Sequence, residues 1–96
     1  MAITITLTET RPDTGIKFHS GSDELKTFIQ EAVNSGKVID NGGGVDETGF
    51  IRTWSFTFPN DDDYIPFRDN DLCISYEADR DDFNNVNGIT KTLEIS

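Results

Sequence analysis

Three consecutive glycines, Gly42–Gly44, form the stretch of this sequence that most resembles a phosphate-binding loop. A P-loop places a glycine, four residues and then Gly-Lys-Ser/Thr at the start of a helix. The Gly36-Lys37 pair is followed by a valine, and no glycine lies five residues before it, so that pattern is absent. The dinucleotide-binding pattern also fails, because its sixth position counted from Gly42 is Glu47. Acidic neighbours would repel phosphate, so we interpret the glycines as a bend beside a strand.

Clustered carboxylates at 61–63, 69–71 and 79–82 are of the residue type that binds calcium. An EF-hand loop requires acidic or amide residues at its first, third and fifth positions, followed by glycine. Counted from the first aspartate of each cluster, the fifth position is Ile65, Cys73 or Phe83. We therefore expect no dedicated metal site. Opportunistic calcium binding by neighbouring carboxylates stays open, and solvated surface charge is the simpler interpretation.

Few side chains suit nucleophilic or acid–base catalysis. His19, the sole histidine, precedes a Ser22-Asp23 pair that we interpret as a helix cap, because catalytic triads are assembled from distant parts of a chain. Cys73, the sole cysteine, lies in an acidic stretch that should raise the pKa of the thiol and weaken it as a nucleophile. Arg52 shares a strand face with Trp54; we expect it to pair with an acid, and a ligand contact is the alternative. The sequence thus predicts no catalytic residue and no cofactor.

Residues 60–82 contain nine acidic and two basic side chains, which make up most of the negative charge of the chain. The acids are Asp61, Asp62, Asp63, Asp69, Asp71, Glu77, Asp79, Asp81 and Asp82. A solvated helix surface is the simpler interpretation. The alternatives are a docking patch for a basic protein, and a mimic of the DNA backbone that inhibits a DNA-binding protein.

The elements that position these residues begin with a strand and a helix. Ile3, Ile5 and Leu7 alternate with threonines, which predicts a strand with one buried face, ended by the turn residues 11–15. Apolar residues then recur at 25, 28, 29, 32 and 33, the period of an amphipathic helix. We expect Ser22 as its N-cap and Gly36 as the left-handed residue beyond its end.

A hairpin of two strands is expected next. The second strand opens at Val38 and contains the glycines, which weaken pairing and permit a bulge, as is typical of a sheet edge. A four-residue turn at 46–49 leads to a third strand, in which Trp54, Phe56 and Phe58 share one face with Phe50.

A second helical region and a last strand complete the chain. Residues 61–65 are expected to form a short helical turn that Pro66 stops. A longer helix should start after Asp69 or Asn70 and end at Asn87-Gly88. Its expected inward residues are Leu72, Cys73, Tyr76, Phe83 and Val86, with Asp79 and Arg80 interrupting the apolar stripe. Residues 92–95 alternate between polar and apolar in a fourth strand.

This order of strands and helices predicts an α+β fold of the ferredoxin-like βαββαβ type, a four-stranded antiparallel sheet with two helices on one face. Right-handed crossovers place the first and third strands at the centre and the second and fourth at the edges. The two central strands are the most apolar, which agrees with that placement.

The sheet face away from the helices should carry mainly hydroxyl side chains. They are Thr4, Thr6, Thr8, Thr53, Ser55 and Thr57. Threonine favours strands on its own account, so plain solvent exposure is the simpler interpretation. A partly wet contact between the sheets of two protomers is the alternative.

Length and charge limit the function classes. The 96 residues make one domain, residues 1–96, with a small core. A net charge of −10 disfavours direct binding to nucleic acid or to anionic membranes. The sequence shows neither a signal peptide nor an apolar stretch of the roughly 20 residues that a membrane helix needs. With a single cysteine, we expect a soluble, intracellular protein.

Three segments carry a resemblance to a known group of proteins. They are ITITLTETRPDT at the N-terminus, GFIRTWSFTF in the third strand, and RDDFNNVNGIT near the C-terminus. Together they resemble small uncharacterised proteins encoded by tailed phages of marine cyanobacteria. The resemblance implies a viral protein, located in the host cytoplasm during infection or in the virion. It supplies no catalytic residues to carry over.

From these observations we expect a non-catalytic protein that acts through protein–protein contacts, as a homo-oligomer and in a structural or virion-associated role. The edge of the second strand and the hydroxyl face are its expected self-association surfaces. An alternative is a dimeric ferredoxin-like ligand-binding protein or monooxygenase-type enzyme, with a pocket between sheet and helices and with His19 or Arg52 facing it. A second alternative is the DNA-mimic inhibitor.

Overall fold

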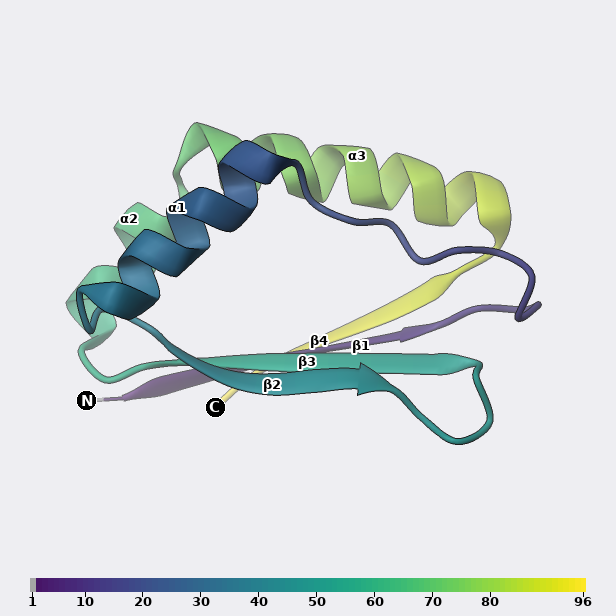
Figure 1. The fold of residues 1–96 in the computed structure, drawn as a ribbon, viewed down its shortest axis with the longest axis horizontal. Coiled ribbons are helices and arrows are strands. Elements are labelled where there is room, and N and C mark those ends of the chain that lie inside the picture. Colours follow the sequence, from purple (N-terminus) through teal and green to yellow (C-terminus); the bar gives the residue numbers. More distant parts are fainter. Residues whose placement is uncertain (1) are drawn as a thin grey trace.

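Helices cover one face of a single four-stranded sheet in the computed structural model, which describes residues 2–96 (Figure 1). In chain order the elements are β1 (Ile3–Thr10), α1 (Asp23–Asn34), β2 (Ile39–Val45), β3 (Ile51–Phe58), a 3₁₀ turn (Asp61–Asp63), α2 (Tyr64–Arg68), α3 (Asp71–Asn87) and β4 (Thr90–Ile95). The strands pair antiparallel in the order β2-β3-β1-β4. This confirms the predicted ferredoxin-like α+β fold, with β1 and β3 at the centre.

Local sequence signals fix both ends of α1. The Ser22 Oγ accepts a hydrogen bond of 3.2 Å from the backbone N–H of Leu25, which makes Ser22 the N-cap. Past the last turn, Gly36 adopts a φ of 79° and its N–H donates to the carbonyl of Val33 at 3.1 Å. The predicted start and end of this helix are both confirmed.

The glycines weaken β2 and place it at the sheet edge, as predicted. The pairing register with β3 shifts between Asp40 and Gly42, which marks a bulge. Gly43 approaches β3 so closely that a Cβ there would lie 2.0 Å from a β3 carbonyl oxygen, so only glycine fits. At the predicted turn, the Gly49 N–H donates to the carbonyl of Asp46 at 3.1 Å, and β3 follows.

The second helical region departs from the prediction at Pro66. This proline does not stop the helical turn but lies inside α2, at its third residue. The first N–H groups of a helix have no intrahelical acceptor, so a proline there costs no hydrogen bond. The boundaries of the longer helix are confirmed: Asn70 caps it, its Oδ1 accepting from the Leu72 N–H at 2.9 Å, and Gly88 ends it with a φ of 71°.

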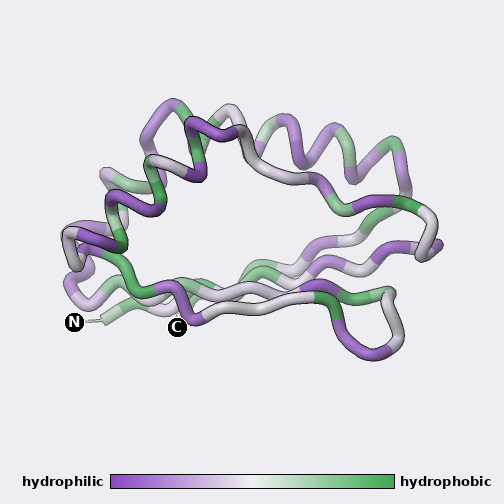
Figure 2. The backbone as a smooth tube through the Cα atoms, in the orientation of Figure 1, coloured by the Kyte–Doolittle hydropathy of each residue, from purple (hydrophilic) through white to green (hydrophobic). Residues whose placement is uncertain are grey.

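The inward face of α3 was only partly predicted. Cys73 is buried, and Leu72, Tyr76 and Phe83 are half-buried, as expected. Val86 was wrongly placed inward, since 83% of it is exposed. Arg80 was wrongly treated as a surface interruption, since only 4% of it is exposed. The α3 stripe that faces the sheet therefore contains polar residues, and hydrophilic segments recur along the whole helix (Figure 2).

The main apolar cluster lies at one end of the molecule, and Leu7 and Ile89 are buried outside it. Its centre is formed by Ala32 of α1, by Phe58 of β3 and by Val38, which precedes β2. The rings of Tyr64 and Phe67 from α2 pack edge-on against Phe58 at 5.3 and 5.1 Å. Toward the other end of the sheet, α3 replaces α1 and α2 as the covering element (Figure 1). No helix within residues 2–96 is long and apolar enough to cross a membrane.

Candidate functional site: a pocket beside a buried ion pair

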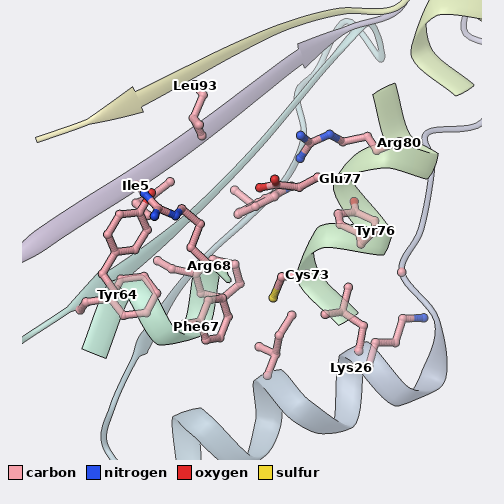
Figure 3. Close-up of a pocket in the computed structure, with 16 residues that line it drawn as sticks. Ile5, Lys26, Tyr64, Phe67, Arg68, Cys73, Tyr76, Glu77, Arg80 and Leu93 are labelled. Carbon is pink, nitrogen blue, oxygen red and sulfur yellow. The ribbon is translucent and has the colours of Figure 1, made fainter. Parts of the chain in front are cut away.

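A pocket of about 250 Å³ lies between the sheet and the helices (Figure 3). Its apolar walls are contributed by all the layers: Ile5, Trp54, Phe56, Phe58 and Leu93 from the sheet, Leu25 and Ile29 from α1, Tyr64 and Phe67 from α2. Its polar residues are Lys26, Arg68, Cys73, Tyr76, Glu77 and Arg80, the last four from α3. Apolar walls with a few polar side chains are typical of sites for small organic molecules.

The pocket is open to solvent beside β4. Among its lining residues, Lys26, Arg68 and Glu77 are exposed, and Leu93 is 47% exposed although it lies on the helix-covered face of the sheet, opposite Leu7. In Figure 3, Arg68 of α2, Glu77 of α3 and Leu93 of β4 surround this side of the space. A ligand could therefore enter without opening the apolar core.

A polar stripe of α3 faces the pocket and the neighbouring part of the sheet. Cys73, Tyr76, Glu77, Arg80 and Asn84 follow one another at helical spacing, so they share one face of the helix. The first four line the pocket, and Asn84 contacts Glu9 of the sheet. Buried polar groups need partners, so this face of α3 depends on polar contacts as well as on apolar packing.

At the far end of the pocket lies a buried polar cluster of Glu9, Arg52 and Asn84, which we call the Glu9 cluster. Glu9 is 0% exposed, and its two carboxylate oxygens accept from Arg52 Nη2 at 2.5 Å and from Asn84 Nδ2 at 3.0 Å. Glu9 and Arg52 are cross-strand partners in β1 and β3, so strand register sets their contact. Arg52 Nε and Asn84 Oδ1 are buried without a hydrogen-bond partner within residues 2–96.

The segment between β1 and α1 closes over this cluster. The carbonyl of His19 accepts from Arg52 Nη2 at 3.1 Å, while its ring stacks on Tyr76 at 5.3 Å. The ring of Phe18 lies between two guanidinium groups, 4.6 Å from that of Arg11 and 4.7 Å from that of Arg52. The connection is thus attached to the sheet and to α3 by aromatic and cationic contacts.

Arg80 is a buried arginine of the site, and the protein engages it through fewer contacts than Arg52. Its Nε lies 3.4 Å from Asp81 Oδ1, and the same oxygen accepts a shorter bond of 2.9 Å from Lys91. Its Cζ lies 5.7 Å from the ring of Tyr76. Within residues 2–96, its two terminal nitrogens make no hydrogen bond or ion pair.

The Cys73 thiol and the Tyr76 phenol, which line the pocket, stay neutral at physiological pH. Burial, reinforced by the nearby Glu77, raises the pKa of the Cys73 thiol to about 11. Burial likewise raises the pKa of Tyr76, with Glu9 adding to the effect and Arg52 opposing it. The expectation of a poorly nucleophilic Cys73 is thereby confirmed, and so is the expectation that Arg52 pairs with an acid.

The structure separates the predicted acidic residues rather than gathering them. They are distributed along the 3₁₀ turn, the α2–α3 junction and α3, and all but the half-buried Asp63 are exposed. Asp69 and Asp81 accept from Arg68 and Lys91, and hydrogen bonding with Lys91 lowers the pKa of Asp81. Within residues 2–96, no three His, Cys, Asp or Glu side chains converge to hold a metal ion.

The predicted hydroxyl residues do share the sheet face away from the helices. Thr4, Thr6 and Thr8 pair across the strands with Thr57, Ser55 and Thr53. The Thr4 and Thr57 hydroxyls lie 3.0 Å apart, and Thr6 donates to Ser55 at 3.4 Å. All six residues are half-buried.

Sequence reasoning missed Glu9, Arg80 and Asn84. Glu9 could have been recognised from its position in β1, because it comes two residues after Leu7 and therefore points to the same buried face of the strand. Arg80 and Asn84 continue the helical stripe that starts at Cys73, and this stripe was expected to be apolar. A charged residue at a position where the pattern predicts burial indicates a partner on a neighbouring element.

Comparisons with known proteins identify a fold. No family model matches the chain, and no curated protein is detectably similar in sequence. The structure resembles a conserved protein of unknown function from Bacteroides thetaiotaomicron, described as a "possible oxidoreductase", with a TM-score of 0.68, 10% identity, and coverage of 99% of this chain and 95% of that one. It also overlaps 27% of a hydantoinase/carbamoylase family amidase from Burkholderia ambifaria, with a TM-score of 0.48 and 4% identity. At such identities the likeness to the Bacteroides protein shows the shared ferredoxin-like fold alone.

Proposed function

We propose that this protein binds a small organic molecule with an apolar or aromatic body in the pocket between its sheet and helices. The observation that carries the proposal is the pocket itself, a solvent-connected space lined by aromatic rings from the sheet and α2. Burial of apolar ligand surface against such walls supplies the driving force for binding.

The volume limits the ligand to a small molecule. A space of 250 Å³ equals about eight water molecules at ~30 Å³ each, so the ligand contains on the order of ten non-hydrogen atoms. This is slightly below the common range of about 300–1,000 Å³ for ligand pockets. A single substituted ring or a short branched chain fits this size.

The chemistry of the walls favours binding without turnover. A thiol with a pKa of about 11 is a poor nucleophile at neutral pH, and Tyr76 is likewise protonated there. His19 and Arg52, which the enzyme hypothesis required in the pocket, are not among its lining residues. Adding flavin or haem together with a bound ligand tests the enzyme alternative, which a cofactor spectral change or a converted product would support.

The binding proposal is tested with single-ring probes and a variant that fills the pocket. Ligand-observed NMR with phenylacetamide and benzyl alcohol should detect binding to the native protein. Cys73→Phe directs a ring into the pocket and should abolish the signal, while Val86→Phe, on the exposed face of the same helix, should retain it. Equal signals from both variants, or none from the native protein, would argue against a ligand site here.

A second candidate function is a non-catalytic role in protein–protein contact as a homo-oligomer. It is favoured by the apolar residues on the β2 edge, where Ile39 and Val45 are each 49% exposed. A virion-associated or structural role would fit the resemblance to phage proteins. Light scattering at high concentration should show a dimer or larger species that Ile39→Lys disrupts, and a monomer throughout would remove this candidate.

A further inference from the structure

We infer that the ligand of the pocket is a small monocarboxylic acid, held by a salt bridge between its carboxylate and Arg80. The inference rests on the proposed pocket function and adds the charge and the polar group of the ligand. It follows from the contacts that the Arg80 side chain makes and from the nitrogens that it leaves free.

Arg80 is buried at a position where a charge is costly. Its side chain is 5% exposed and lines the pocket. Arginines are almost never buried without a partner, because a desolvated guanidinium needs an acid and several hydrogen bonds. The terminal nitrogens of Arg80 are not among the buried polar atoms that lack a partner, so their N–H groups remain accessible from the pocket. They can therefore donate to an acid that binds there.

Within residues 2–96, the one acid that pairs with Arg80 is Asp81, and it leaves both terminal nitrogens of the guanidinium free. A guanidinium carries five N–H donors, and Arg80 uses only Nε, in a 3.4 Å contact with an aspartate already bonded to Lys91. Both oxygens of Glu9 are taken by Arg52 and Asn84. Glu77 also lines the pocket but makes no ion pair with Arg80.

The other arginines of this region use their terminal nitrogens for hydrogen bonds within the protein. Arg11 donates from Nε to the Gly49 carbonyl at 2.7 Å and from Nη1 to the Ile16 carbonyl at 2.6 Å. Arg52 donates from Nη2 to both Glu9 and the His19 carbonyl. Arg80 differs from both in having neither terminal nitrogen engaged within residues 2–96.

A carboxylate fits the free donors better than other anions. The terminal nitrogens of a guanidinium form a planar fork that matches the two oxygens of a carboxylate. A dianion such as a phosphate ester would meet Glu77 at the mouth and a net protein charge of −10. Arg80 projects from α3 toward the sheet near Glu77 (Figure 3), so an acid bound there would leave its apolar body among the aromatic walls.

Phenylacetate and phenylacetamide separate this inference from the pocket proposal, because they have the same shape and ten non-hydrogen atoms each but differ in charge. Calorimetric or NMR titration should show the native protein binding phenylacetate about 10- to 100-fold more tightly, as charge-assisted hydrogen bonds imply. Arg80→Gln should reduce this ratio to near one while leaving phenylacetamide binding within about threefold. Arg80→Lys keeps the charge but not the fork and should give an intermediate ratio.

Lys17→Gln is the matched control, since it removes one positive charge at an exposed loop position outside the pocket. It should leave the acid-to-amide ratio unchanged. Equal binding of the two compounds to the native protein would overturn the carboxylate inference and leave the pocket proposal intact. A ratio that survives Arg80→Gln would likewise overturn it, whereas failure of both compounds to bind would count against the pocket proposal as well.

Thermal unfolding of the unliganded variants provides an independent readout. If the terminal nitrogens of Arg80 serve a ligand acid, then Arg80→Met removes a buried charge whose only ion pair is the 3.4 Å contact with Asp81, and it should leave the melting temperature unchanged or higher. If Arg80 were instead a structural residue satisfied within the chain, the same change would lower the melting temperature, and the inference would be wrong.

Discussion

Removal of Arg52 should be among the most damaging single changes to stability, because it leaves Glu9 buried without its cation. Glu9 is 0% exposed, so its charge cannot reach water when the partner is removed. Breaking a buried pair in this way costs about 3–5 kcal/mol. For a domain whose total stability is about 5–15 kcal/mol, that is a large share.

The other contacts of Arg52 set the net value for Arg52→Met. The hydrogen bond to the His19 carbonyl contributes about 0.5–1.5 kcal/mol, and the contact with the ring of Phe18 adds about 0.5–1 kcal/mol. In the opposite direction, the substitution removes the buried Nε that has no hydrogen-bond partner, which stabilises the folded state by about 1–3 kcal/mol. The net loss of unfolding free energy is therefore about 4 kcal/mol, which lowers the melting temperature of a domain of this size by about 16 °C or more.

The assay is equilibrium unfolding in urea, followed by the fluorescence of Trp54, the only tryptophan. Arg68→Met is the matched control, because Arg68 pairs with Asp69 at the surface, with side chains 48% and 58% exposed; this change should cost less than about 1 kcal/mol. The double variant Glu9→Met/Arg52→Met should be more stable than Arg52→Met, since it removes the orphaned acid. It leaves the neutral Asn84 amide without its acceptor and, like the single variant, the His19 carbonyl without its donor.

Two results would refute this reasoning. One is an Arg52→Met protein within 1 kcal/mol of the native stability. The other is a double variant that is no more stable than the single one, which would mean that the cost does not arise from the buried carboxylate.

Three further predictions follow from the core, the glycines and the thiol. Phe58→Ala should lower the free energy of unfolding in urea by about 3–5 kcal/mol, because Phe58 is 1% exposed. Val86→Ala, at an exposed position of α3, should change it by no more than about 0.5 kcal/mol. Similar losses would contradict the placement of Phe58 in the apolar cluster. Gly43→Ala should lower the free energy of unfolding by about 1–3 kcal/mol more than Gly44→Ala in the same assay. Both glycines have a positive φ, but only at Gly43 would the new Cβ collide with β3. Equal losses would argue against that close approach. Alkylation of Cys73 at pH 8 should be about a hundredfold slower in the native protein than in the denatured chain, because raising the pKa from 9.0 to about 11 lowers the thiolate fraction by about that factor. The native rate should increase as the pH approaches 11. A fast native rate at pH 8 would refute the pKa shift.

Elements governed by local signals could be predicted from the sequence. The cap at Ser22, the left-handed Gly36 and the glycine-softened edge strand each depend on neighbouring residues. The alternation of residues in β1 and β3 indicated which face of each strand is covered by the helices, and the order of the elements predicted the topology of the sheet. The fold class was therefore accessible without coordinates.

The interior of the site was not accessible in the same way, because its contacts join distant residues. Glu9 meets Arg52 across 43 positions of the chain and Asn84 across 75. Apolar periodicity identifies helix faces by hydrophobicity, so it could not identify an inward face of α3 that contains Arg80 and Asn84. Pro66 was misread for a related reason, since a proline in the first turn of a helix has the same local sequence as one that ends a helix.

The separation of the apolar cluster around Phe58 from the Glu9 cluster has a consequence for how such a scaffold can diversify. The two clusters join the sheet to the helices at different places, and some pocket-lining residues, such as Leu93, belong to neither. If the proposed ligand binds in the pocket, substitutions at those residues change the ligand preference without removing either set of contacts between the layers. Under that proposal, ligand specificity and the stability of the fold depend on different residues.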